Sequence, residues 1–347
     1  LTRVARLARD LVALQDESDA LTVAALSSPP GDPVITNLVN VSIVATAMGA
    51  RLGYCGEELE RLALAALLHD VGLWVVPQSL VRKAGGLTRE ERLILEQHPI
   101  LGSALVRDSG TDYGWLADVV LQAHERINGS GYPNGRRGKE VEELAQLIGV
   151  ADIFDALISE RPYRRRLFPH EAMKELLVSE RQAFPRNVIA LLVEQLSFYP
   201  LGTRVKLTTG DVGVVVGVNS AYPLRPVVER TSAGDGGSGR LDLSTIPGLA
   251  IVEALEPPSV DSGQWFMSAA SSGNMPIHTY GSPDDQVASL LEHLDDLAVM
   301  MQGVIEAQEA SPDQVVVTHP ILSPEEPGLR AAPYVGHASI HGVTARW

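Results

Sequence analysis

The sequence predicts a mainly α-helical chain, with a helical bundle, then a small β-barrel, then one more helix and an extended tail. Three observations support this fold class. Apolar residues recur at helical spacing from Val34 to about Leu196, with short breaks that contain glycine, proline or aspartate. Five short β-rich runs then follow one another closely. A last segment with helical periodicity extends from Val287 to Val304.

Changes in composition divide the 347 residues into four regions. The run Ser27–Pro33 reads SSPPGDP and ends the first helix, and Tyr199-Pro200 precedes the first β-rich run. The expected regions are an N-terminal helix and linker (1–33), a helical domain (34–198), a small SH3-like barrel (199–256), and an acidic region with one helix at about 283–308 and an extended tail (257–347).

The barrel prediction depends on five strands. Thr209-Gly210 is typical of a hairpin turn between the first two of them. The expected strands are Thr203–Thr208, Asp211–Asn219, Pro226–Thr231, Leu241–Ile246 and Ile251–Leu255. Further along, Ser282 followed by Pro283 and acidic residues is typical of a helix N-terminus.

Two apolar stripes near the chain ends have coiled-coil spacing, one from Val4 to Leu14 and the other from Val287 to Val304. Neither is long enough to be stable alone, so each must pack on its own chain or on a second copy. The region from Pro258 onwards has two arginines, no lysine and eleven acidic residues, a net charge of −9, and two such tails would repel each other. We therefore predict a homodimer through the first helix, with a lid on the next domain as the alternative role of that helix.

Charge and composition exclude several classes of protein. The net charge of −15 disfavours non-specific nucleic-acid binding, which depends on many Lys and Arg contacts with phosphates. The single cysteine, Cys55, excludes an intrachain disulfide and is typical of a cytoplasmic protein. The apolar stretch Pro33–Ala50 is interrupted by polar residues, which predicts an amphipathic core helix and no membrane span.

Residues of the metal-ligating types fall at wide intervals in the helical domain. They are the adjacent pair His69-Asp70, then His98, His124 and Asp152, each at one end of a helix-sized segment. A bundle could bring all five together, and imidazole and carboxylate ligands suit Fe, Mn, Zn, Co or Ni rather than Ca. Two cations that share a carboxylate can activate a hydroxide for displacement at phosphorus. The alternative is that each histidine is a buried, hydrogen-bonded core residue.

Several motifs resemble, in the same order, those of the HD-GYP subgroup of the HD-domain phosphohydrolases. The resemblance covers about Thr36–Leu177, and the barrel is similar to an extension found in some members. The motifs are HDVG at His69, EQHPILGSALV around His98, HERINGSGYP from His124 to Pro133, VADIFDAL around Asp152 and SERPYR ending at Arg164. The resemblance implies metal-dependent hydrolysis of cyclic di-GMP, a bacterial second messenger, at a site with two or three metal ions, often iron or manganese.

The resemblance also implies roles for single residues. The metal ligands would be His69, Asp70, His98, His124 and Asp152, with Asp70 as the bridging, catalytic carboxylate. Arg161 and Arg164 would hold the substrate phosphates, for which a guanidinium fork is well suited. The GYP loop, with Gly129, Gly131, Tyr132 and Pro133, would shape the site entrance and could dock a diguanylate cyclase or another signalling protein.

Four positions depart from the family pattern. Asn37 and Ala123 stand where the family has histidine ligands, Leu73 replaces a lysine that faces the phosphate, and Asn128 replaces the aspartate of the GYP motif. The loss of ligands predicts at most one tightly held divalent ion, iron or manganese first, or none. We therefore expect hydrolysis of cyclic di-GMP to be weak or lost, as in a pseudo-enzyme. The alternatives are a non-catalytic module that binds a nucleotide or docks a protein, and a metal phosphohydrolase with another substrate.

Overall fold

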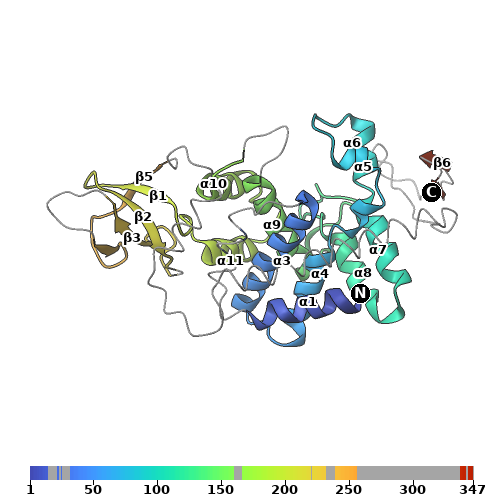
Figure 1. Ribbon diagram of the computed structural model, residues 1–347, viewed down its shortest axis with the longest axis horizontal. Helices are drawn as coiled ribbons and strands as arrows, with labels where there is room; N and C mark the ends of the chain where they lie inside the picture. The colour runs from blue at the N-terminus through green and yellow to red at the C-terminus, as the bar shows by residue number, and fades with distance from the viewer. Residues whose placement is uncertain are drawn as a thin grey trace.

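The computed structural model consists of a helical bundle at one end and an antiparallel sheet at the other (Figure 1). The structure describes residues 1–14, 22, 25, 32–159, 166–219, 221–231, 239–255, 337–340 and 343–346. The α-helices are α1 (Thr2–Ala13), α3 (Pro33–Leu52), α4 (Glu57–Leu68), α5 (Gln78–Val81), α6 (Arg89–Leu95), α7 (His98–Asp108), α8 (Gly114–Gln122), α9 (Glu143–Ile158), α10 (Pro169–Ser179) and α11 (Arg186–Leu196). Short 3-10 turns are η2 (Val71–Trp74), η3 (Thr111–Tyr113) and η4 (Gly138–Glu140).

Helix α3 is the centre of the bundle. Asp32 caps its N-terminus by accepting a hydrogen bond from the Val34 amide, and Gly53, with φ of +99°, ends it. Every residue from Leu38 to Gly49 is buried, and the helix packs against α4, α9 and α11. The expected core helix is confirmed, but its expected amphipathic character is wrong, because neighbouring helices cover it all round. By length and composition it could also cross a membrane, yet 67% of its most apolar window is buried inside the protein, as in a core helix.

Helix α1 contributes its apolar stripe to the same core. Val4, Leu7 and Leu11 are buried, and the helix packs against α4. Helix α1 thus packs on its own helical domain, as in the alternative in which it serves as a lid. Its buried side chains are therefore unavailable for the predicted dimer contact. One continuous apolar cluster extends from α1 to α11, and a second, smaller cluster lies in the sheet.

The sheet is open, so the predicted closed barrel is wrong. Its five antiparallel strands are β1 (Arg204–Leu207), β2 (Val212–Gly217), β3 (Val227–Arg230), β4 (Arg240–Asp242) and β5 (Ile251–Leu255), each within or next to an expected run. Their order is β4-β3-β2-β1-β5, with Val205 opposite Gly213 in the predicted β1–β2 hairpin. Closure would require the edge strands β4 and β5 to pair. Strand β4 has three residues and pairs only with β3 among the described strands, so it offers too short a ladder to close the sheet.

The predicted C-terminal helix at about 283–308, with its stripe Val287–Val304, lies outside the described residues. In the expected extended tail the structure describes two strands, β6 (His337–Ile340) and β7 (Val343–Arg346), which pair as an antiparallel hairpin.

Candidate metal centre

The bundle brings the ends of separate helices to one place. His69 is the C-cap of α4, and Asp70 follows it immediately. His98 begins α7, and His124 comes two residues after the end of α8. Asp152 lies within α9, which packs against α3, α4 and α8. The side chains of all five predicted ligand residues therefore lie close together. The expectation that each stands at the end of a helix is wrong for Asp152, which reaches the site from within α9.

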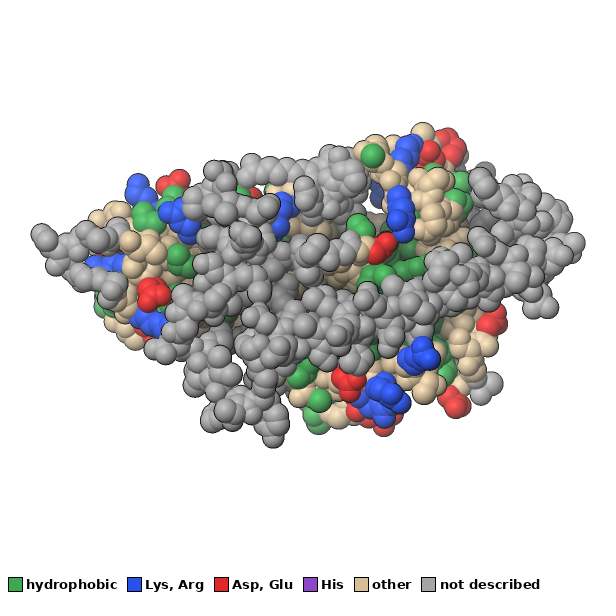
Figure 2. Space-filling view, viewed as in Figure 1, with side chains coloured by type: hydrophobic (Ala, Val, Ile, Leu, Met, Phe, Trp, Pro, Cys, Tyr) green, Lys and Arg blue, Asp and Glu red, His purple; other side chains and the backbone are tan. Residues whose placement is uncertain are grey.

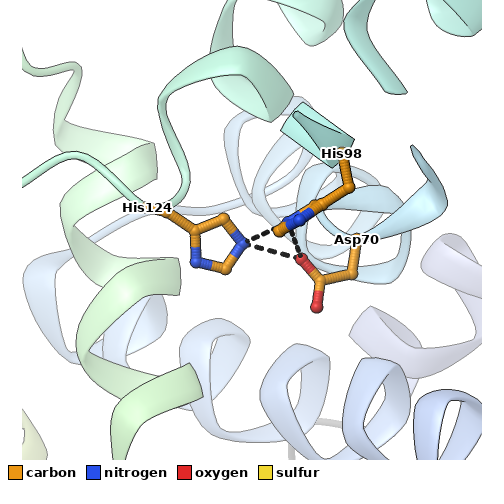
Figure 3. Close-up of side chains that lie close together, drawn as sticks. All are labelled: Asp70, His98 and His124. Carbon is orange, nitrogen blue, oxygen red and sulfur yellow. Dashed lines mark hydrogen bonds and ion pairs between the residues drawn. The ribbon is translucent and has the colours of Figure 1, made fainter. Parts of the chain in front are cut away.

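Asp70, His98 and His124 form the tightest cluster (Figure 3). The Asp70 Oδ1 atom lies 2.7 Å from His124 Nε2 and 3.0 Å from His98 Nε2, and the two imidazole nitrogens are 2.9 Å apart. Each side chain offers one ligand atom, and these atoms all lie within 4.8 Å of one another. Lone pairs at such separations repel unless a proton or a cation lies between them. The donor set therefore fits a divalent transition metal.

His69 and Asp152 form a second half of the site. The Nδ1 atom of His69 lies 2.8 Å from the Ala66 carbonyl oxygen, so its Nε2 atom is the one that faces the carboxylates. That nitrogen lies 3.6 Å from Asp70 Oδ1 and 3.9 Å from Asp152 Oδ1, and it has no hydrogen-bond partner although the residue is fully buried. A buried polar atom without a partner is costly in free energy. Its position fits a ligand of a cation shared with Asp70.

The carboxylates and imidazoles shift one another's pKa. Burial alone would raise the pKa of Asp70, but His69, His124 and His98 around it hold that pKa well below its usual range. Burial likewise opposes charge on His69, yet Asp70 and Asp152 together raise its pKa to about 9. For His124 burial prevails over the attraction of Asp70, and its pKa is lowered. Without metal, the two carboxylates therefore favour the protonated form of His69.

Gly72, in the HDVG motif, lets α7 approach the ligand pair. A Cβ atom at this position would lie 1.9 Å from the His98 carbonyl oxygen and 2.6 Å from the Gly102 amide nitrogen. Any side chain here would push away the first turn of α7, which carries His98. The glycine of the motif thus has a packing role that sets the position of a ligand.

The GYP loop covers the cluster. The Tyr132 ring stacks on His124, with centroids 5.0 Å apart and planes at 6°, and its edge meets His98 at 6.0 Å. Gly131 makes this possible, because a Cβ atom there would lie 2.4 Å from the His124 carbonyl oxygen. Burial, followed by the nearby Asp70 and Asp152, raises the pKa of Tyr132, so its hydroxyl stays protonated.

The residue that holds this loop in place, Glu125, is not among the predicted site residues. Glu125 is 1% exposed, and its carboxylate accepts hydrogen bonds from the backbone amides of Asn134 (2.7 Å) and Arg136 (2.9 Å). A charged residue directly after a ligand in HERIN was the available signal, because acidic side chains are rarely buried without such partners.

The four departures from the family pattern occupy different surroundings. The Asn37 amide faces Asp152, whereas Ala123 lies in the apolar core at 1% exposure. Leu73 is half-buried in η2. The Asn128 side chain accepts hydrogen bonds from the amide and hydroxyl of Ser130, which shapes the turn of the GYP loop.

Arg161 and Arg164, the predicted phosphate contacts, lie outside the described residues. Elsewhere, basic and acidic side chains of described residues are interspersed on the face shown in Figure 2. That face therefore has mixed charge where its residues are described.

The fold and the site define a class: a helical protein whose buried His/Asp cluster can hold a divalent transition metal. The HD domain family matches residues 8–188, which is more than half of the chain. The chain belongs to the HD domain family and is homologous to HD-GYP cyclic di-GMP phosphodiesterases.

Three curated relatives illustrate this homology. The cyclic di-GMP phosphodiesterase PA4108 of Pseudomonas aeruginosa is 32% identical over 55% of this chain and 46% of its own length. The cyclic di-GMP phosphodiesterase response regulator RpfG of Xanthomonas campestris pv. campestris is 38% identical over 45% and 42%. The 3'3'-cGAMP-specific phosphodiesterase 3 of Vibrio cholerae is 32% identical over 46% and 35%. This chain thus spans about half the length of the curated relatives it matches, or less.

Proposed function

We propose that this chain is an HD-GYP-type cyclic dinucleotide phosphodiesterase whose hydrolysis is weak or lost. The observation that carries the proposal is the buried cluster of Asp70, His98 and His124, whose ligand atoms lie within 4.8 Å of one another. The relatives' activity on cyclic di-GMP or 3'3'-cGAMP supports the substrate class. Iron or manganese suits the mixed imidazole and carboxylate donors.

Asp70, His98 and His124 would hold the ion. His69 and Asp152 lie next to this cluster, with His69 Nε2 3.6 Å from Asp70 Oδ1 and Asp152 Oδ2 3.7 Å from His124 Nδ1. When bound, a divalent cation polarises a phosphoryl oxygen and lowers the pKa of a bound water. The chain's own residues prepare the site for this. The carbonyl oxygens of Leu95 and Ala66 orient His98 and His69 by accepting hydrogen bonds from their Nδ1 atoms. The Tyr132 ring covers one face of His124 and excludes water from it.

Three features support weak turnover. The Asn37 amide presents an N–H group to Asp152, so the atom facing the carboxylate is not a metal ligand. Leu73 has no charge with which to meet a phosphate, and Ala123 has no ligand atom. We assign the phosphate contacts of the substrate to Arg161 and Arg164 on the strength of the SERPYR motif.

The test is hydrolysis of cyclic di-GMP and of 3'3'-cGAMP by protein loaded with Mn²⁺ or Fe²⁺. We expect little or no linear product from the unmodified chain. Restoring Asn37→His, Leu73→Lys and Ala123→His together should raise the rate. Vigorous turnover of either nucleotide by the unmodified chain would contradict the proposed loss of activity, and it would identify the substrate.

A second candidate function is a non-catalytic module that binds the nucleotide or docks a signalling protein. The contacts of the GYP loop favour this second function. Glu125 and Tyr132 hold the loop in place, although the site beneath it has fewer metal ligands than the family pattern. Calorimetric titration with cyclic di-GMP, followed by product analysis, separates the two functions: binding without product supports the module. A diguanylate cyclase is the partner class to test in pull-down with the Tyr132→Ala variant as control.

A further inference from the structure

The side chain of Asn37 not only lacks the imidazole of a histidine ligand but also makes hydrogen bonds of its own at the site. Its Nδ2 atom lies 3.3 Å from Asp152 Oδ1 and 2.7 Å from Asp155 Oδ2. The amide therefore donates both of its N–H bonds to carboxylates. The opposite orientation would turn the amide oxygen towards two carboxylates, so the surroundings determine which atom faces Asp152.

Asp155 is held in this arrangement by other donors. Its Oδ1 atom accepts from Asn40 Nδ2 at 2.8 Å, and its Oδ2 atom also lies 3.3 Å from the Ser159 hydroxyl. Asn40 and Asp155 are both 3% exposed. Because its oxygens are occupied by amides and a hydroxyl, Asp155 serves as an anchor for Asn37 rather than as a ligand.

The N–H group of Asn37 points at the oxygen that a second cation would need. Asp152 Oδ1 is the atom that faces His69 Nε2 at 3.9 Å, and His69 Nε2 has no hydrogen-bond partner. A cation between His69, Asp70 and Asp152 would compete with the Asn37 N–H group for the same carboxylate oxygen. The hydrogen of the Asn37 N–H group carries a partial positive charge, so it would repel a cation bound at the same oxygen.

We propose that Asn37, anchored by Asp155 and Asn40, takes the place of a second cation beside Asp152 and makes this chain a one-ion protein, with the ion at Asp70, His98 and His124. Asn37 is thus a positioning residue that acts through Asp152. The inference rests on the metal binding of the proposed function. It differs from simple ligand loss in one respect: removing the Asn37 amide should increase the number of ions bound, even without adding a ligand.

The experiment is Mn²⁺ titration of the metal-free full chain by calorimetry, with bound Mn²⁺ per chain measured after gel filtration. We expect one Mn²⁺ per chain for the unmodified protein and for the matched control Asn219→Ala, because Asn219 is a half-buried residue in the turn that follows β2 and its side chain contacts only that turn. Asn37→Ala should gain a second site, weaker than the first by about tenfold or more, because His69, Asp70 and Asp152 become free to share an ion. Two Mn²⁺ ions that share Asp70 also couple magnetically, which broadens the electron paramagnetic resonance spectrum.

Asn37→Ser carries the same prediction if the alanine variant does not fold, since a serine hydroxyl is too short to serve both carboxylates. A single ion in the folded Ala or Ser variant would overturn the inference and leave the metal site of the proposed function intact. Two ions in the unmodified chain would overturn it as well. No Mn²⁺ binding by the unmodified chain would overturn the proposed function together with the inference.

Discussion

Replacing Gly72 with alanine should damage the site without touching a ligand. The new Cβ atom would lie 1.9 Å from the His98 carbonyl oxygen, against a practical minimum of 3.0 Å, and the obstacle is backbone rather than a flexible side chain. The start of α7 must therefore retreat by about 1 Å. This movement would lengthen the 3.0 Å separation between His98 Nε2 and Asp70 Oδ1 and loosen one of three ligands.

We expect the Gly72→Ala substitution to lower both the stability of the protein and its affinity for Mn²⁺. Overpacking of this kind costs about 1–3 kcal/mol, against about 0.4–1 kcal/mol gained from restricting the unfolded chain. Near the middle of these ranges the net loss of stability is about 1–2 kcal/mol, which for a domain of this size corresponds to a fall in Tm of roughly 2–8 °C. Displacing a ligand should weaken Mn²⁺ binding by at least the roughly 10–100-fold typical of a lost supporting contact.

The assays are thermal unfolding of the metal-free protein and Mn²⁺ titration by calorimetry. Gly114→Ala is the matched control, because Gly114 begins α8 with helical φ and ψ of −56° and −44° and has open space where the Cβ would lie. That variant should be neutral or more stable by about 0.4–1 kcal/mol, with unchanged Mn²⁺ affinity. If Gly72→Ala keeps both the Tm and the Mn²⁺ affinity of the unmodified chain, the packing argument is refuted.

Three further predictions follow from the same geometry. His124→Ala should weaken Mn²⁺ binding by about 10–100-fold or more. The control is His170→Ala, which should not change the affinity because His170 lies in the first turn of α10 and is not one of the clustered side chains. Equal affinities for the two variants would exclude His124 as a ligand. The pKa of His69 is raised to about 9, so in metal-free protein its stabilising contribution is complete below about pH 6.5 and is lost as the pH rises through 9; a urea midpoint that stays constant from pH 7 to 10 would contradict this. Glu125→Ala leaves two backbone amides of the loop without their acceptor, which should cost about 1–3 kcal/mol and speed proteolysis beside Tyr132; an unchanged cleavage rate would show that another contact holds the loop.

The residues that could be predicted from the sequence are those that a local pattern identifies. Helical periodicity located the bundle, and β-rich runs located all five strands of the open sheet. The spacing of His69, Asp70, His98, His124 and Asp152 predicted a shared site because each was expected at the end of a helix-sized segment. Four of them do lie at or next to helix ends, whereas Asp152 lies within α9 and reaches the site from the face of that helix. These inferences needed only the chemistry of each residue and its neighbours in the chain.

Tertiary structure alone decided the rest. Nothing within the segment around Asn37 shows that its amide meets Asp152 and Asp155, since these partners are 115 and 118 residues away and depend on how α3 packs against α9. The burial of α3 on all sides and the open edges of the sheet likewise follow from which elements meet. The sequence by itself determined which side chains were available as ligands and on which elements they lie. Only the packing of distant helices decided which atom of each side chain faces the site, because hydrogen-bond direction is set by partners that the local sequence does not contain.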